Sequence, residues 1–217
     1  IEELSDEAER IGRALRDNWL TSKALTGHSL FHTSYGRPDE ARRWAQKLFE
    51  LTRETNDPRP RAMGLWALAI LEATHFAPEE AVESGREGAG LALSVMDSGA
   101  ALVGQGMGLA LLGRNEEAYQ LLSTTGDLVK SRGIALITGV IDPFKGIAMM
   151  GLGDMAGGEK CIMDCIEMQR RWNSPGSVAT GDLVLGEIYT RMALGIDAPP
   201  LGVIMRNLPY VLKTVPF

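Results

Sequence analysis

One short pattern recurs four times at almost constant spacing, and it constrains the fold more than any other feature. Its copies are Gly36-Arg-Pro-Asp-Glu-Ala41, Phe76-Ala-Pro-Glu-Glu-Ala81, Gly113-Arg-Asn-Glu-Glu-Ala118 and Gly153-Asp-Met-Ala-Gly-Gly158. The first residues of successive copies lie 40, 37 and 40 positions apart. Pro or Asn followed by acidic residues, as in the first three copies, is typical of a helix start. A repeat of this length predicts stacked helix pairs that bury their apolar faces against one another.

Small residues stand on both sides of each predicted turn. They are Ser29, Ala69, Gly106 and Gly146 before the turns, and Ala41, Ala81, Ala118 and Gly158 after them. Small side chains at these places let two antiparallel helices approach closely. Over about residues 22 to 172 the pattern resembles the tetratricopeptide repeat, although that family's unit is about 34 residues long and its aromatic positions are mostly missing here. The resemblance implies an all-α fold, a right-handed α-α superhelix of antiparallel helix pairs.

Apolar periodicity and helix-stop residues divide the chain into helices. We expect one domain over 1–217, with a long first helix that begins at the N-cap Ser5. Pro143 should kink its helix, or restart it with Asp142 as the cap. The Pro-rich tail 198–217 should form short helices at best and lead to further repeats. The predicted helices are 5–35 with 38–55, 60–75 with 78–95, 98–112 with 115–131, 134–151 with 154–172, and an additional helix 177–194.

Composition narrows the class of protein. Apolar residues make up 45% of the chain and charged residues 23%, which indicates a globular fold. The formal net charge of −6, with basic residues only in short pairs, argues against nucleic acid or an anionic membrane as partner. The uncharged stretch 98–113 is shorter than the roughly 18 residues of a membrane span. Two cysteines four residues apart favour a reduced, cytoplasmic setting. The chain begins at Ile1 and ends at Phe217, and we expect it to be a fragment of a longer protein.

In a tetratricopeptide solenoid the first helix of each pair lines the concave face, and here those positions are apolar. Three interpretations remain open: core of a tightly wound superhelix, which is favoured, a groove for a peptide or helix, or a small-molecule pocket. A free solenoid does not expose so large an apolar patch, so the superhelix, the tail, further repeats or a partner must cover it. The partner would be a protein or peptide, upstream domains of the same chain, or a second copy in a homodimer. The predicted concave residues are Leu30, Met63, Trp66, Ile70, Val103, Met107, Ile147 and Met150.

Several residue groups carry side chains suited to chemistry, but none of them predicts a catalytic, cofactor or metal site. His28 and His32 lie four apart, as in a two-histidine metal pair, but packing between helices is favoured. The segment 104–108, Gly-Gln-Gly-Met-Gly, resembles a dinucleotide loop yet lies inside a helix, so helix contact is favoured. Cys161 and Cys165 are expected to be core thiols. Asp142 and Lys145 are expected to form a structural pair, with a polar contact in the groove as the alternative.

The tail carries a second resemblance. The run from Gly186 to Gly195, then Pro199-Pro200, then 203–217 resembles a segment of large bacterial proteins in which a class III adenylate or guanylate cyclase is joined to an ATPase and a tetratricopeptide region. The match covers about 30 residues. No catalytic residue carries over, because the cyclase carboxylates and the phosphate loop have no counterpart here. The resemblance implies a non-catalytic interaction or regulatory region of such a signalling protein.

Two alternatives stay open from the sequence. The repeats also suit the ligand-sensing region of a large ATP-dependent transcriptional activator. An enzyme that uses His28, His32 or Asp142 in the groove is the third hypothesis.

Overall fold

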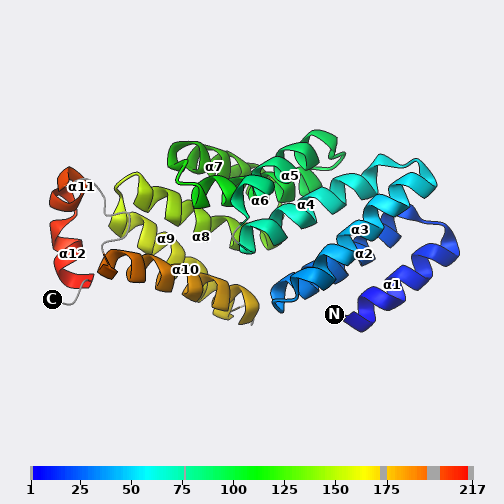
Figure 1. The fold of residues 1–217 in the computed structure, drawn as a ribbon, viewed down its shortest axis with the longest axis horizontal. Helices are drawn as coiled ribbons and strands as arrows, with labels where there is room; N and C mark the ends of the chain where they lie inside the picture. The colour runs from blue at the N-terminus through cyan, green and yellow to red at the C-terminus, as the bar shows by residue number, and fades with distance from the viewer. Residues whose placement is uncertain (1, 76, 172–174, 195–200, 215–217) are drawn as a thin grey trace.

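The computed structural model describes residues 2–75, 77–171, 175–194 and 201–214, which form twelve α-helices and, within these ranges, no strand (Figure 1). The helices are α1 (Glu2–Leu15), α2 (Asn18–Ser34), α3 (Pro38–Thr55), α4 (Pro58–Thr74), α5 (Pro78–Leu91), α6 (Val95–Leu111), α7 (Asn115–Ser131), α8 (Ala135–Gly151), α9 (Met155–Arg171), α10 (Pro175–Leu194), α11 (Leu201–Arg206) and α12 (Leu208–Thr214).

The helices stack in two layers. From α1 to α10 each helix packs on the next one along the chain, and α2, α4, α6 and α8 also contact one another in order. These four form an inner layer, and α3, α5 and α7 each pack between two successive inner helices. One end of the long axis is α1, and α11 and α12 lie at the other (Figure 1). The expected all-α helical-repeat solenoid is confirmed.

The glycines at three of the predicted turns adopt the left-handed backbone conformation that such turns need. Gly36, Gly113 and Gly153 have positive φ values of 65°, 71° and 93°, a backbone conformation that glycine adopts without strain. The turn expected at Phe76 lies outside the described residues at that position. Pro38, Pro58 and the equivalent proline of α5 occupy first helical positions, where the missing N–H costs nothing.

The small residues do bring paired helices close together. The hydroxyl of Ser29 donates to the carbonyl oxygen of Ala41 at 2.9 Å. A Cβ added to Gly146 would lie 2.7 Å from the carbonyl oxygen of Gly158, and one added to Gly104 would lie 2.5 Å from the Cβ of Ala69. The glycine-rich segment 104–108 is therefore a helix contact, as predicted.

The long first helix predicted over 5–35 is wrong, because the chain breaks there into α1 and α2. Arg16 has a φ of +53°, and the side chain of Asp17 accepts hydrogen bonds from the backbone N–H groups of Trp19 and Leu20. Asn56 and Asp57, 40 residues later, repeat this arrangement between α3 and α4, with a φ of +54° at Asn56.

Other boundaries differ by less. The helix predicted over 78–95 ends at Leu91, because Ser94 caps α6 and accepts from the N–H of Asp97. Helix α8 continues through Pro143, so the predicted restart at Asp142 is wrong. The tail forms the short helices α11 and α12, while residues 172–174, 195–200 and 215–217, within the predicted helix end and tail, lie outside the described part of the chain.

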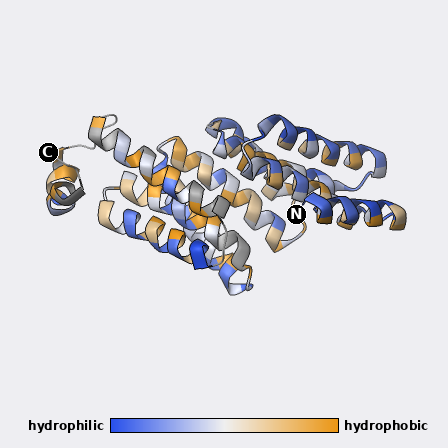
Figure 2. Cartoon of the chain, turned by 90° about the horizontal axis from the view of Figure 1, so that it is seen from below, coloured by the Kyte–Doolittle hydropathy of each residue, from blue (hydrophilic) through white to orange (hydrophobic). Residues whose placement is uncertain are grey.

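The core runs along the interface of the layers. One buried cluster extends from Leu25 of α2 to Ala148 of α8, and a second joins α8, α9 and α10 around Ile162 and Ile166. Hydrophobic residues are most frequent in the middle of the molecule, whereas the helices near the N-terminus carry mostly hydrophilic ones (Figure 2). No helix in the described ranges is both long and apolar enough to cross a membrane.

Candidate interaction surface

The eight predicted concave residues lie in the core and do not line an open groove. Five of them have exposed fractions of 6% or less, and Leu30, Ile70 and Ile147 are partly buried against the main cluster. Seven belong to or border that cluster, and Met150 belongs to the second one. The buried five are Met63, Trp66, Val103, Met107 and Met150. Their apolar character is thus that of core residues, the interpretation that the sequence favoured.

An ion pair helps to close the inner layer. The ammonium of Lys23 in α2 donates to the carboxylate of Asp97 in α6 at 2.8 Å, across the intervening helix α4. Asp97 is buried and also accepts from the hydroxyl of Ser94 at 2.6 Å. This contact joins α2 directly to α6, two inner helices that are not adjacent in the stack.

The two histidines pack between helices. His28 is buried and stacks on Trp44 of α3, with ring centroids 4.0 Å apart, and its Nε2 lies 3.2 Å from the carboxylate of Asp6. Burial lowers the pKa of His28, opposed by the nearby carboxylates of Asp6 and Glu9. His32 is also buried, with its ring edge against Phe31. Within the described ranges, no three His, Cys, Asp or Glu side chains gather as a metal site would need.

The other residues considered for chemistry, Asp142, Lys145 and the two cysteines, also make structural contacts. Asp142 and Lys145 form an ion pair at 3.7 Å, and burial raises the pKa of Asp142. The thiols of Cys161 and Cys165 are unpaired and donate to the carbonyl oxygens of Asp142 and Gly139. Burial raises both thiol pKa values, that of Cys165 to about 11, which suppresses the nucleophilic thiolate.

One exposed apolar surface lies on α1. Leu4, Ile11 and Leu15 fall on one face of this helix, and their exposed fractions are 75%, 37% and 70%. The face turned to α2 buries only the small residues Ser5 and Gly12. We call the face of Leu4, Ala8, Ile11 and Leu15 the α1 stripe. An open groove beside it is lined by Leu4, Ser5, Ala8, Leu20, Lys23 and Ala24.

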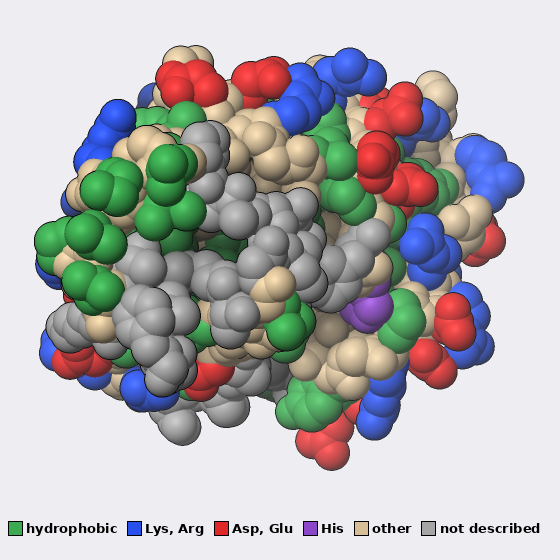
Figure 3. Space-filling model, turned by 60° about the vertical axis from the view of Figure 1, so that its left-hand side comes forward, with side chains coloured by type: hydrophobic (Ala, Val, Ile, Leu, Met, Phe, Trp, Pro, Cys, Tyr) green, Lys and Arg blue, Asp and Glu red, His purple; other side chains and the backbone are tan. Residues whose placement is uncertain are grey.

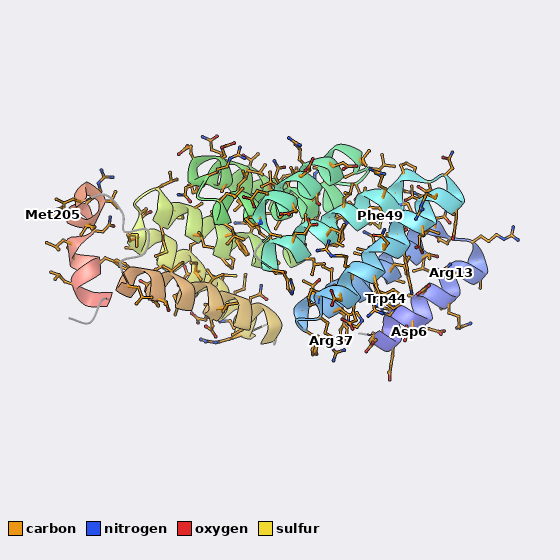
Figure 4. All side chains as sticks on the ribbon, viewed as in Figure 1. Asp6, Arg13, Arg37, Trp44, Phe49 and Met205 are labelled. Carbon is orange, nitrogen blue, oxygen red and sulfur yellow. The ribbon has the colours of Figure 1, made fainter. Side chains whose placement is uncertain are left out.

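The repeat explains why this stripe is apolar. Forty residues after Leu4, Ala8 and Ile11 stand Trp44, Leu48 and Leu51 of α3, which lie against or within the core. Helix α1 packs on α2 as α3 packs on α4, but α3 also has α2 on its other side, and α1 has no such neighbour among the described helices. The stripe is therefore the face on which a preceding inner helix would lie. Figure 4 shows Trp44 of α3 close to α2, and Asp6 and Arg13 on α1.

A second apolar region lies at the other end. Figure 3 shows hydrophobic side chains gathered there beside residues that are not described. Leu201 and Met205 of α11 and Leu208 and Leu212 of α12 contribute to it. The amide of Asn207 donates to the carbonyl oxygen of Gly153 at 2.8 Å, which joins α11 to the turn before α9.

The α1 stripe was not among the predicted site residues, because the apolar pattern over 5–35 predicts one continuous helix. A step of 40 residues back from Asn56-Asp57 reaches Arg16-Asp17 and would have located the break. Leu4, Ala8 and Ile11 would then have aligned with Trp44, Leu48 and Leu51 of α3. No protein-family model matches this chain, and no curated protein matches it either.

Proposed function

We propose that this chain is a non-catalytic protein-interaction and regulatory repeat region that binds an apolar helix on its α1 stripe. The observation that carries the proposal is the exposure of Leu4 and Ile11, whose repeat equivalents in α3, Trp44 and Leu51, lie against or within the core. An exposed apolar face of this kind marks an interaction site. An amphipathic helix laid in an apolar groove is a common mode of recognition between proteins.

The side chains that could support catalysis favour the same proposal. His28 and His32 pack against aromatic rings, and Cys161 and Cys165 are unreactive thiols. The placement in a larger cyclase-like signalling protein of the cytoplasm is a further part of the proposal, and it depends on the resemblance of 186–217. Binding of the partner would then be transmitted along the solenoid to upstream domains.

The test compares three forms of the 217-residue chain immobilised for capture from cell extract. The wild type is set beside Leu4→Glu with Ile11→Glu, and beside Tyr119→Glu with Leu128→Glu as the matched control on α7. Ile11, Tyr119 and Leu128 are each 37% exposed, so the substitutions at these three positions are equally accessible. Retained proteins are identified by mass spectrometry, and affinity is then measured with the purified partner.

We expect the wild type and the α7 control to retain the same protein and the α1 variant to bind it at least tenfold more weakly. Retention of a partner that is indifferent to the α1 substitutions would contradict the proposal, as would retention of none. Circular dichroism of all three forms checks that the α1 variant is still folded.

A further inference from the structure

His28 is a buried titratable side chain at the junction of three helices. It belongs to α2 and is only 1% exposed. Asp6 of α1 and Trp44 of α3, both labelled in Figure 4, cover its ring from two different helices. The contact between Nε2 and the carboxylate of Asp6 lacks hydrogen-bond geometry, so neither ring nitrogen has a hydrogen-bond partner among the described residues. A proton added to this ring would therefore be a buried charge with no acceptor in place.

The indole of Trp44 is in contact with other groups on both of its faces. The ring of His28 stacks on it, with centroids 4.0 Å apart and an angle of 11° between the planes. The ammonium of Lys47 lies 3.4 Å from the centroid of the same indole. Because two groups this close to the ring cannot share one face, Lys47 lies on the face opposite His28. A protonated His28 would place a second cation against an indole that already holds one.

The charged groups that face His28 come from α1 and α3. The carboxylates of Glu2, Asp6 and Glu9 on α1 favour the protonated ring. The ammonium of Lys47 on α3 opposes it. Asp6 is 64% exposed, so water screens its charge and weakens its attraction for the ring. Burial outweighs these charges and holds the pKa of His28 below its ordinary value of 6.5.

The two helices that cover His28 differ in how firmly they are held. Helix α3 buries large apolar side chains, Leu48 and Leu51 among them. Helix α1 buries only Ser5 and Gly12, two small residues that contribute little apolar area. A charged ring is therefore relieved most easily when α1 moves away, which opens His28 to water while α3 stays in place.

We propose that protonation of His28 undocks α1 from α2 and α3, so that mild acid opens this end of the solenoid. The docked state favours the neutral ring, whereas the ring of the undocked state is hydrated and binds a proton with an ordinary histidine pKa. Docking is therefore complete above that pKa and weakens as the pH falls below it. The groove beside the α1 stripe is lined by both α1 and α2, so it exists only while α1 is docked. This response belongs to the chain alone and needs no partner.

Nuclear magnetic resonance of the imidazole rings measures the titration of His28 directly. The chain has 3 histidines, so the signal lost in His28→Gln identifies the ring. His32→Gln and His75→Gln identify the other two signals, which assigns His28 even if its own variant does not fold. We expect His28 of the wild type to titrate below 6.5. Titration at or above this value would overturn the proposal, because the docked state would then favour the charged ring.

Hydrogen exchange between pH 5 and pH 7.5 measures the docking of α1. Amide protection of Glu2–Leu15, corrected at each pH for the intrinsic exchange rate, should fall about threefold or more from pH 7.5 to pH 5. Protection of Pro38–Thr55 should stay unchanged. His28→Phe keeps an aromatic ring against Trp44 but cannot be protonated, so its α1 protection should not depend on pH in this range. His75→Phe, at an exposed position after α4, is the matched control and should respond as the wild type does.

Two outcomes of the exchange experiment would also overturn the proposal. One is α1 protection that rises as the pH falls, because protonation would then tighten the contact with Asp6. The other is an equal loss of α1 protection in His28→Phe and in the wild type. His28→Leu supplies a second uncharged side chain for this comparison if His28→Phe does not fold.

Discussion

Helices α1 and α3 occupy equivalent places in the repeat, yet only one of them is covered. Both follow the same 40-residue pattern, and both end at a residue of positive φ before an aspartate cap. Leu51 of α3 is buried in the core, whereas Ile11 at the matching position of α1 is 37% exposed. The same apolar pattern is thus part of the core at one position of the array and exposed at another, according to which helices pack on it.

The largest effect should distinguish these two equivalent positions. Leu51→Ala removes a buried side chain and should destabilise the protein by about 2–5 kcal/mol. Ile11→Ala, in dilute protein, should cost no more than about 1 kcal/mol, because half-exposed positions lose little. Urea unfolding followed by circular dichroism measures both. Similar losses at the two sites would mean that the α1 stripe is covered in the free chain.

The second comparison is between two glycines, one at a close contact between helices and one on an open surface. Gly146→Ala forces a Cβ to within 2.7 Å of a backbone oxygen of α9 and should cost about 1–3 kcal/mol. Gly90→Ala, with nothing within 4 Å, should stabilise α5 by about 0.5–1 kcal/mol. Thermal unfolding midpoints should therefore move in opposite directions. A shift in the same direction would contradict the tight pairing of α8 with α9.

The third comparison is between α2 and α4, where Lys23 occupies the position of Met63 in the repeat. Lys23→Met leaves the buried carboxylate of Asp97 without its ammonium partner and should cost about 1–2 kcal/mol, since the pair is only partly buried. Adding Asp97→Asn should recover most of the loss. A double-mutant cycle by chemical denaturation gives the coupling. A coupling near zero would mean that the ion pair does not hold α2 to α6.

The smallest effect concerns Glu72 of α4. Glu72 is buried and stands 40 residues after His32, which is buried at the equivalent position of α2. Burial raises the pKa of Glu72, opposed by hydrogen bonds from Ser84 and the nearby charge of Arg42. The folded protein therefore holds this proton more tightly than the unfolded chain, whose glutamate pKa is about 4.3. Its stabilising contribution is present below that pH and is lost as the pH rises through the folded pKa.

Glu72→Gln should accordingly be the more stable form at pH 7 and lose this part of the pH dependence. The expected gain is about 1 kcal/mol or less. Unfolding midpoints of both proteins between pH 4 and pH 7 provide the measurement. Parallel profiles for the two proteins would show that Glu72 is not titrating with a raised pKa.

The repeat could be predicted from the sequence because the residues at its turns each favour one backbone conformation or one kind of helix contact. A glycine such as Gly113 adopts positive φ, and a small residue such as Ser29 allows a close helix pair. The break at Arg16 was harder to predict, because an arginine carries no preference for the left-handed conformation. Only comparison with Asn56 at the same repeat position identifies it.

The candidate site could be predicted less well. Apolar residues such as Met63 and Trp66 have the same appearance in sequence whether they line a groove or fill a core. The choice depends on how closely successive inner helices approach, which contacts between distant residues such as Lys23 and Asp97 determine. For Leu4 and Ile11 the reverse holds, because their pattern is that of core residues although both are exposed among the described helices.

Hydrogen exchange tests the comparison of α1 with α3 most directly. In dilute protein the amides of Glu2–Leu15 should exchange much faster than those of Pro38–Thr55, since one face of α1 is open. With a captured partner, α1 should gain protection while α3 stays unchanged. Protection of α1 equal to that of α3 in dilute protein, or no gain with the partner, would contradict the assignment of the α1 stripe as the binding surface.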